Sequence, residues 1–190
     1  MIDNRLPRRT SIRLRAFDYA QHGAYFVTVC SHQRECLFGE VSGQTMQMNE
    51  AGSIVAGTWD CLPDHYPHVE TDALIVMPNH VHAIIMLTDG VVAGPVGTGS
   101  TPGRDGEGVS VAAGSKPAPT IRHGLPEIVR AFKTFSARRI NDYRGTPGQP
   151  VWQRNYHEHV IRDEASLNRI RRYIAENPAT WDADPDNVTV

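Results

Sequence analysis

The sequence is poor in cysteine, with only Cys30, Cys36 and Cys61 among its 190 residues and no Cys-x-x-Cys pair. An odd number of cysteines without such a pair disfavours a disulfide framework. Cys30 and Cys36 together with nearby histidines leave a zinc site open as an alternative, although their spacing is not that of a zinc ligand knuckle.

Long apolar runs are also missing, since no stretch approaches the roughly 18 apolar residues of a membrane-spanning helix. The basic segment at 1–15 lacks the apolar centre of a signal peptide. No P-loop pattern is present, which disfavours chemistry driven by ATP. We therefore expect a cytoplasmic protein with no membrane partner.

Net charge is small, at −2, but the basic residues are clustered. Arginines without acids occupy 5–15, a second basic group spans 130–144, and 169–172 reads Arg-Ile-Arg-Arg. Basic stripes on a nearly neutral protein are compatible with a polyanionic partner. A solvated charged surface is the alternative interpretation.

Hydrophobic periodicity and turn residues predict the secondary structure. Strands are expected at 23–31, 71–78, 80–87 and 157–161, and helices at 50–62, 125–145 and 164–177, with a hairpin or extended loop at 36–49 and a turn at 63–70. The predicted domain organisation is a basic arm at 1–22, one domain at 23–181 with a flexible Gly/Pro-rich insertion at 88–122, and an acidic tail at 182–190.

The order of these elements predicts the fold class. The first six follow the β-α-β-β-α-β order of ferredoxin-like proteins, which predicts an α+β, RRM-like antiparallel sheet with helices on one face. A further helix follows at the C-terminal end.

Two histidines, His80 and His82, open the strand at 80–87 directly after a Pro-Asn turn. Side chains alternate along a strand, so both imidazoles share one face and can converge on one metal ion. The alternative is that two polar residues face solvent on a half-exposed strand.

The last predicted helix carries a second pair of polar residues. Leu167, Ile170 and Ile174 form its apolar stripe, while Tyr173 and Asn177 lie together on the flank of that stripe. A tyrosine in this position most commonly packs in the core. Beside a paired-histidine strand, its phenol can instead be a nucleophile, and the amide oxygen can be a metal ligand.

Three segments resemble the single-tyrosine HUH transposases of the REP-associated and insertion-sequence type. They are GAYFVTVCSHQRECLFG, HYPHVETDALIVMPNHVHAIIML, and VWQRNYHEHVIRDEASLNRIRRYIAENPATW, and together they span most of residues 23–181. The last is similar to the family's WQ-x-x-Y/F-x-x-H-x-I-R segment and its Tyr-x-x-x-Asn-Pro helix. The insertion at 88–122 departs from compact members of the family.

This resemblance implies the roles of the site residues. His80, His82 and Asn177 would bind a divalent ion, Mg²⁺ or Mn²⁺, and Tyr173 would be the nucleophile that forms a 5′-phosphotyrosine. Tyr156 is a rival nucleophile, since it lies in the neighbouring motif. The substrate would be single-stranded or hairpin DNA, and the enzyme would be a DNA endonuclease and strand transferase acting as a monomer or homodimer.

Several residues are candidates for contacts with DNA. The positively charged and imidazole side chains are Arg130, Lys133, Arg138, Arg139, Arg154, His159, Arg162, Arg169 and Arg172. Tyr25, Phe26 and Trp152 could stack on bases, although core packing is expected for at least two of them. Two alternative functions remain: a non-catalytic nucleic-acid-binding module on the same fold, and a metal-dependent hydrolase without a covalent intermediate.

Overall fold

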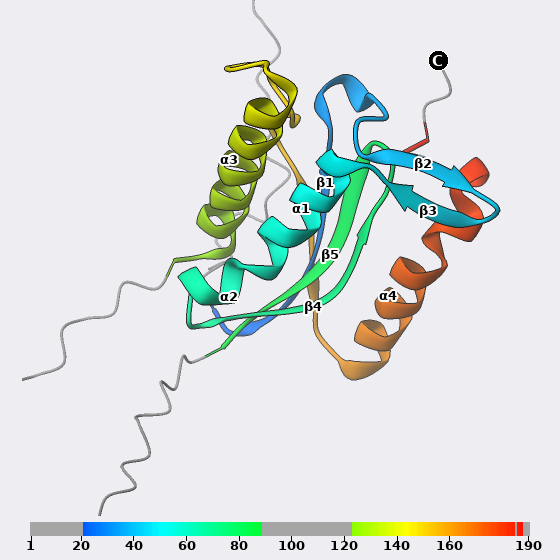
Figure 1. Cartoon of the computed structure of the whole chain (residues 1–190). Helices are drawn as coiled ribbons and strands as arrows, with labels where there is room; N and C mark the ends of the chain where they lie inside the picture. The colour runs from blue at the N-terminus through cyan, green and yellow to red at the C-terminus, as the bar shows by residue number, and fades with distance from the viewer. Residues whose placement is uncertain (1–20, 89–122, 185, 188–190) are drawn as a thin grey trace, which may run out of the picture.

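The computed structural model describes residues 21–88, 123–184 and 186–187 (Figure 1). The predicted arm up to residue 20 and the predicted insertion from residue 89 lie outside the described residues. The elements in chain order are β1 (Gly23–Cys30), η1 (His32–Arg34), β2 (Gly39–Ser42), β3 (Thr45–Met48), α1 (Glu50–Asp60), α2 (Leu62–His65), β4 (Val69–Val76), β5 (His80–Leu87), α3 (Leu125–Arg144), β6 (His157–Ile161), α4 (Glu164–Glu176) and η2 (Asn177–Ala183).

Four strands form the main sheet in the order β4-β5-β1-β6, and every neighbouring pair is antiparallel. This is the strand order of a ferredoxin-like fold, so the predicted fold class is confirmed. The hairpin β2–β3 forms a separate two-stranded ribbon between β1 and α1. β5, which carries the two histidines, is an interior strand.

Capping residues in the sequence account for the ends of the long helices. The Asn49 side chain accepts a hydrogen bond from the Gly52 amide at the start of α1, at 3.0 Å. The Asp163 side chain accepts from the Ser166 amide at the start of α4, at 2.7 Å. α3 ends at Gly145, whose φ of 64° is the left-handed conformation that glycine adopts without strain.

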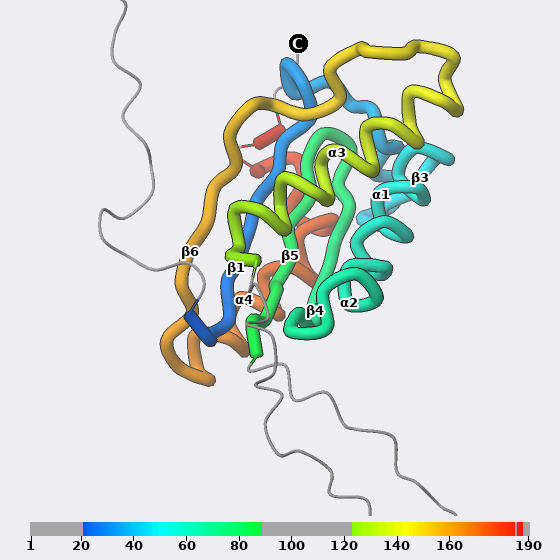
Figure 2. Tube along the Cα trace, turned by 90° about the vertical axis from the view of Figure 1, so that its left-hand side faces the viewer, coloured from blue at the N-terminus to red at the C-terminus, as the bar shows by residue number. Residues whose placement is uncertain are grey.

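The two faces of the sheet are covered by different helices. Figure 2 shows α1 and α3 on one side of the sheet and α4 on the other. The main core lies under α1 and α3, where Trp59 packs edge-to-face on Phe132 with ring centroids 5.1 Å apart. On the opposite side, Ile174 of α4 packs with Ile84 and Ile161. The prediction of helices on one face therefore holds for α1 and α3, and α4 forms a third layer.

Two local expectations are corrected by the structure. The turn expected at 63–70 begins as the short helix α2, because Pro63 fits a first helical turn. The helix expected to end at 177 is followed directly by the 3-10 helix η2, Asn177–Ala183, so Pro178 does not end the helical structure. This second difference brings the chain beyond α4 back to the sheet.

Candidate active site

His80 and His82 are buried side by side on the face of β5 that α4 covers. Their exposed fractions are 0% and 2%, and their ring centroids lie 4.4 Å apart. The Pro-Asn turn before them is fixed by a hydrogen bond from the Met77 amide to the His80 carbonyl, at 2.8 Å. The interpretation that these histidines face solvent is therefore wrong, because β5 is flanked by β4 and β1 and covered by the C-terminal elements.

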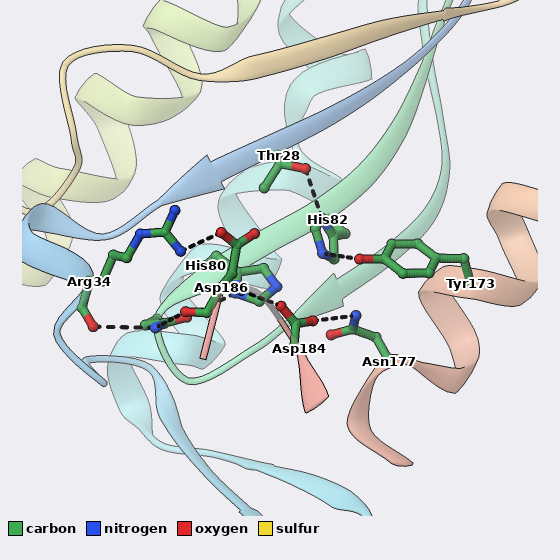
Figure 3. Close-up of polar contacts among 9 residues, drawn as sticks. Thr28, Arg34, His80, His82, Tyr173, Asn177, Asp184 and Asp186 are labelled. Carbon is green, nitrogen blue, oxygen red and sulfur yellow. Dashed lines mark hydrogen bonds and ion pairs between the residues drawn. The ribbon is translucent and has the colours of Figure 1, made fainter. Parts of the chain in front are cut away.

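Both histidines are hydrogen-bonded, and the partner of His80 defines which of its ring nitrogens carries the proton. His80 Nδ1 lies 2.9 Å from Asn79 Oδ1, which can only accept, so Nδ1 donates and Nε2 holds a lone pair. His82 Nδ1 lies 2.8 Å from Thr28 Oγ1, and His82 Nε2 lies 3.1 Å from Tyr173 Oη (Figure 3). His82 thus directs Nε2 toward α4, and His80 Nε2 is buried without a hydrogen-bond partner.

Both imidazoles are held in the neutral form. Burial, followed by the neighbouring His80, lowers the pKa of His82 to about 3. Burial also lowers the pKa of His80, against an opposing effect of the carboxylates of Asp186 and Asp184. Neutral imidazole is the form that ligates metals.

α4 positions Tyr173 over this pair. Its apolar stripe buries Ile174 against β5 and β6, and Arg171 forms an ion pair with Asp72, which lies at a β-bulge of β4. The Arg171 Nε–Asp72 Oδ1 hydrogen bond measures 3.0 Å. Tyr173 remains 42% exposed while its hydroxyl reaches His82. The helix is therefore held to the sheet of its own chain, with the phenol at the boundary between the site and solvent.

The pKa of Tyr173 is raised above its ordinary value. Partial burial is the main cause, and the charges of Asp184 and Asp186 add to it, while a hydrogen bond with Asn177 acts in the opposite direction. The phenol is thus protonated in this arrangement and needs activation before it can attack a phosphate.

Asp184 is a site residue that the sequence patterns did not reveal. It is buried, and its Oδ2 accepts a hydrogen bond from Asn177 Nδ2 at 2.9 Å (Figure 3). One potential ligand atom from each of His80, His82 and Asp184 lies within 4.8 Å of the others. The acidic composition of 182–190 is the only signal in the sequence, because an irregular segment has no periodicity that would place Asp184 on β5.

The segment that carries Asp184 is anchored beside the histidines. Asp186 forms an ion pair with Arg34, and its carbonyl accepts from Asn79 Nδ2 at 2.8 Å. Its amide also donates to Asp184 Oδ1 at 2.6 Å. The Asn79 of the Pro-Asn turn therefore connects the start of β5 to the C-terminal segment.

The donor set fits a divalent cation. Among the described residues, His80 Nε2 and Asn177 Oδ1 are buried and have no hydrogen-bond partner, which is costly for polar atoms unless a ligand completes them. Imidazole nitrogens combined with amide or carboxylate oxygens suit a cation between the soft and hard extremes. Over the same described residues, the single cluster of possible His, Cys, Asp and Glu ligands contains neither Cys30 nor Cys36, so the zinc alternative has no structural support.

Of the aromatic residues considered for base stacking or as the nucleophile, some lie in the main core and one lies beside the site. Tyr25 and Trp152 are buried in the main core, as expected for at least two of the three stacking candidates. Phe26 instead lies beside the site, with its ring centroid 5.3 Å from that of His82. Tyr156, the rival nucleophile, packs against the main core rather than beside the two histidines.

The candidate DNA-binding residues lie on different sides of the molecule. His159, Arg162, Arg169 and Arg172 are exposed on β6, on α4 and between them, whereas Arg130, Arg138 and Arg139 are exposed on α3, on the opposite layer. Arg154 is exposed in the segment before β6. Lys133 donates hydrogen bonds to the carbonyls of residues 153, 154 and 155, at 2.5, 3.0 and 3.4 Å, so its ammonium group is already engaged within the protein.

Comparisons with known proteins find two relatives by sequence. No protein-family model matches the chain. An uncharacterized Haemophilus influenzae protein is 37% identical over 179 residues, 93% of this chain and 91% of that protein. Another Haemophilus influenzae protein, called "Putative REP-associated tyrosine transposase", is 29% identical over 161 residues, 85% of this chain and 73% of that protein.

A solved structure has a similar fold. It is a REP-associated tyrosine transposase bound to a REP hairpin, 18% identical, with a TM-score of 0.53 over 90% of this chain and 74% of that chain. The chain shares with that structure the fold of the HUH tyrosine transposases, and its interior strand β5 presents a His-x-His pair to a tyrosine on α4. The chain is thus similar in sequence to a putative REP-associated tyrosine transposase and similar in fold to a solved one.

Proposed function

We propose that this protein cleaves and rejoins single-stranded DNA beside a hairpin, through a covalent bond between Tyr173 and a 5′-phosphate. The observation that carries the proposal is the 3.1 Å contact between Tyr173 Oη and His82 Nε2, on a helix held to the same sheet. The related transposase solved with a REP hairpin supports hairpin DNA as the substrate class.

His80 and His82 would hold the divalent cation through their neutral Nε2 atoms, and Asn177 Oδ1 and Asp184 would supply oxygen ligands. Mg²⁺ or Mn²⁺ fits this mixed set. When bound, the cation supplies positive charge that binds the scissile phosphate and stabilises the charge developing in the transition state. His82 Nε2 would not accept from Tyr173 while it holds the cation, so Tyr173 Oη would be available to the phosphate.

Tyr173 Oη would then attack phosphorus in line with the leaving 3′-oxygen. The Oη–P bond forms as the P–O3′ bond breaks, the phenol proton passes to solvent, and the released 3′-oxygen takes up a proton. A 3′-hydroxyl can reverse these steps and rejoin a strand. Because the phosphotyrosine conserves the energy of the phosphodiester bond, the cycle needs no nucleotide cofactor.

The exposed basic residues would hold the DNA backbone at two places. Arg169, four residues before Tyr173, lies on the same flank of α4, and Arg172, Arg162 and His159 are near the same layer. We propose that this group contacts phosphates near the cut. Arg130, Arg138, Arg139 and Arg154 would contact more distant DNA, and Lys133 would support the segment at 153–155 instead.

The experiment is incubation of labelled hairpin DNA carrying a single-stranded flank with protein and Mg²⁺ or Mn²⁺, followed by a denaturing gel. We expect a covalent protein–DNA adduct and a free 3′-OH fragment, both lost in Tyr173→Phe and on removal of metal by a chelator. Tyr156→Phe is the matched control and should still form the adduct.

Two other outcomes would contradict the proposal. Cleavage that survives Tyr173→Phe without any adduct would indicate a metal-dependent hydrolase. Hairpin binding by the wild-type protein without cleavage in either metal would indicate a nucleic-acid-binding module.

A further inference from the structure

Part of the sheet beside Tyr173 is not covered by α4. Phe26 of β1 pairs directly with His159 of β6, and the next pair along is Thr28 with His157. Side chains at these four positions point to the same face as His82, which is itself the cross-strand partner of Thr28. His157 and His159 are exposed and Phe26 is partly exposed, and we call these three residues the uncovered strip.

The uncovered strip is continuous with the candidate active site. The Phe26 ring centroid lies 5.3 Å from that of His82 and 6.1 Å from that of Tyr173, edge-on to the latter. Its chain neighbours Tyr25 and Val27, on the other face, are 1% and 0% exposed. A ring that stays accessible next to the proposed nucleophile can receive a flat group from a substrate bound there.

The chemistry of the uncovered strip suits a nucleic acid strand. Imidazoles donate hydrogen bonds to phosphate oxygens, and an aromatic face stacks on any base. The residue between the two histidines, Glu158, points to the opposite face by strand alternation, so it does not place a carboxylate on the strip. Neighbouring strands are about 4.8 Å apart, so the path from His82 on β5 across to β6 is about 10 Å long.

We propose that the unpaired DNA strand next to the scissile phosphate crosses the uncovered strip, with one base stacked on Phe26 and with His157 and His159 bonded to backbone phosphates. This inference rests on the proposed function, because it assigns the path of the substrate at the same site. A paired base already has both faces stacked within a duplex, so Phe26 selects substrates whose bases next to the cut are unpaired. Phe26 is thus a positioning residue that places the phosphate under Tyr173.

The test pairs removal of the protein ring with removal of single bases from the DNA. Hairpin substrates with single-stranded flanks would each carry one abasic nucleotide, at successive positions around the cut. Binding would be measured in the Tyr173→Phe background, so that no strand is cleaved during the titration. We expect one position near the cut at which base removal weakens binding by about tenfold, in line with the range for one base–aromatic stack.

Phe26→Leu should weaken binding of intact DNA by a similar factor and show no additional loss on that one abasic substrate. Such non-additivity marks a direct contact, which a purely structural role of Phe26 would not produce. Phe26→Tyr keeps the ring and should bind like its parent. Tyr143→Leu removes a ring that is 62% exposed on α3, on the other layer, and should bind every substrate like its parent, including the loss at that one abasic position.

The stacking assignment would be overturned if the loss of affinity from Phe26→Leu and the loss from base removal multiplied at every abasic position. Normal binding of intact DNA by Phe26→Leu would also overturn it. If Phe26→Leu fails to fold, as judged by its melting temperature, His157→Gln combined with His159→Gln tests the same path at two exposed positions. That variant should bind several-fold more weakly because two phosphate contacts are lost, and unchanged binding would overturn the path. The proposed function is tested by a separate measurement, which is adduct formation by the protein that retains Tyr173. Failure of the path and failure of the proposed function can therefore be distinguished.

Discussion

At the residue scale, the two nitrogens of His82 have different partners and therefore different tasks. Nδ1 is bonded to Thr28 Oγ1, which orients the ring, while Nε2 is directed toward α4. Groups that bond the distal nitrogen of a ligating histidine fix its tautomer and orientation. Thr28 is thus a supporting residue for the proposed metal site, although it makes no proposed contact with metal or DNA.

Thr28→Val tests this support, because it removes the hydroxyl while nearly preserving side-chain shape. We expect the affinity for Mn²⁺ to fall by about 10- to 100-fold, since the His82 ring is no longer oriented. Calorimetric titration of the metal would measure this. Thr58→Val makes the same change at a buried position on α1, where the hydroxyl donates to the Ile54 carbonyl, and should leave the affinity unchanged. Equal affinities for all three proteins would contradict the role of Thr28.

Part of this site could be predicted from the sequence. Strand alternation was sufficient to place His80 and His82 on one face, and helical spacing was sufficient to bring Tyr173 and Asn177 together. Their burial could not be predicted, because it depends on α4 and η2, which are distant in sequence. Asp184 lies in a segment where neither period applies, so only the folded chain reveals it beside Asn177.

At the element scale, α3 and the segment before β6 are joined by Lys133. Its ammonium group donates to the carbonyls of residues 153–155, and Trp152 Nε1 donates to Ser136 Oγ of the same helix at 3.0 Å. Burial lowers the pKa of Lys133 to about 8. These contacts set the position from which β6 begins.

The pH dependence of unfolding should report this burial. Between about pH 8 and pH 10.5, the unfolded chain holds a proton on Lys133 that the folded chain has lost. The unfolded state therefore binds more protons, and the free energy of unfolding rises with pH across this window. In denaturant unfolding, the free energy of unfolding of the wild type relative to that of Lys133→Met should therefore rise with pH across this window. Parallel pH profiles would show that burial does not perturb Lys133.

The elements were predictable to different degrees. β1, β5, α3 and α4 match their predicted ranges closely, because their periodicity is strong and Asp163 and Gly145 mark helix ends. α2 was not predicted, since Pro63 is common both in turns and in first helical turns. The extension through η2 was missed for the same reason at Pro178.

At the scale of the whole molecule, the site is assembled from segments that lie far apart in one chain. β1, β5 and α4 each contribute side chains, and the segment after α4 closes the site through Asp184 and Asp186. Within the described residues, no helix is long and apolar enough to cross a membrane. The apolar contacts of Ile174 and the ion pair of Arg171 hold α4 to its own sheet, which predicts that Tyr173 acts on DNA bound by the same chain.

Complementation between two inactive variants tests this arrangement. Tyr173→Phe keeps the metal-binding residues, and the double variant His80→Ala, His82→Ala keeps the tyrosine. If the catalytic helix acts within its own chain, an equimolar mixture should form no more adduct than either variant alone. Restored adduct formation in the mixture, measured on the same denaturing gels, would show that the helix is exchanged between subunits.

The central claim, that Tyr173 becomes covalently bonded to DNA, can be tested directly on the peptide that carries it. Trypsin cleaves after Arg171 or Arg172, and residues 173–190 contain no lysine, no arginine and no tyrosine other than Tyr173, so one tryptic peptide carries this tyrosine without any other from the sequence. After reaction with hairpin DNA and nuclease trimming, mass spectrometry should find a nucleotide on this peptide. A nucleotide on the peptide that contains Tyr156, or cleaved DNA with no modified peptide, would contradict the claim.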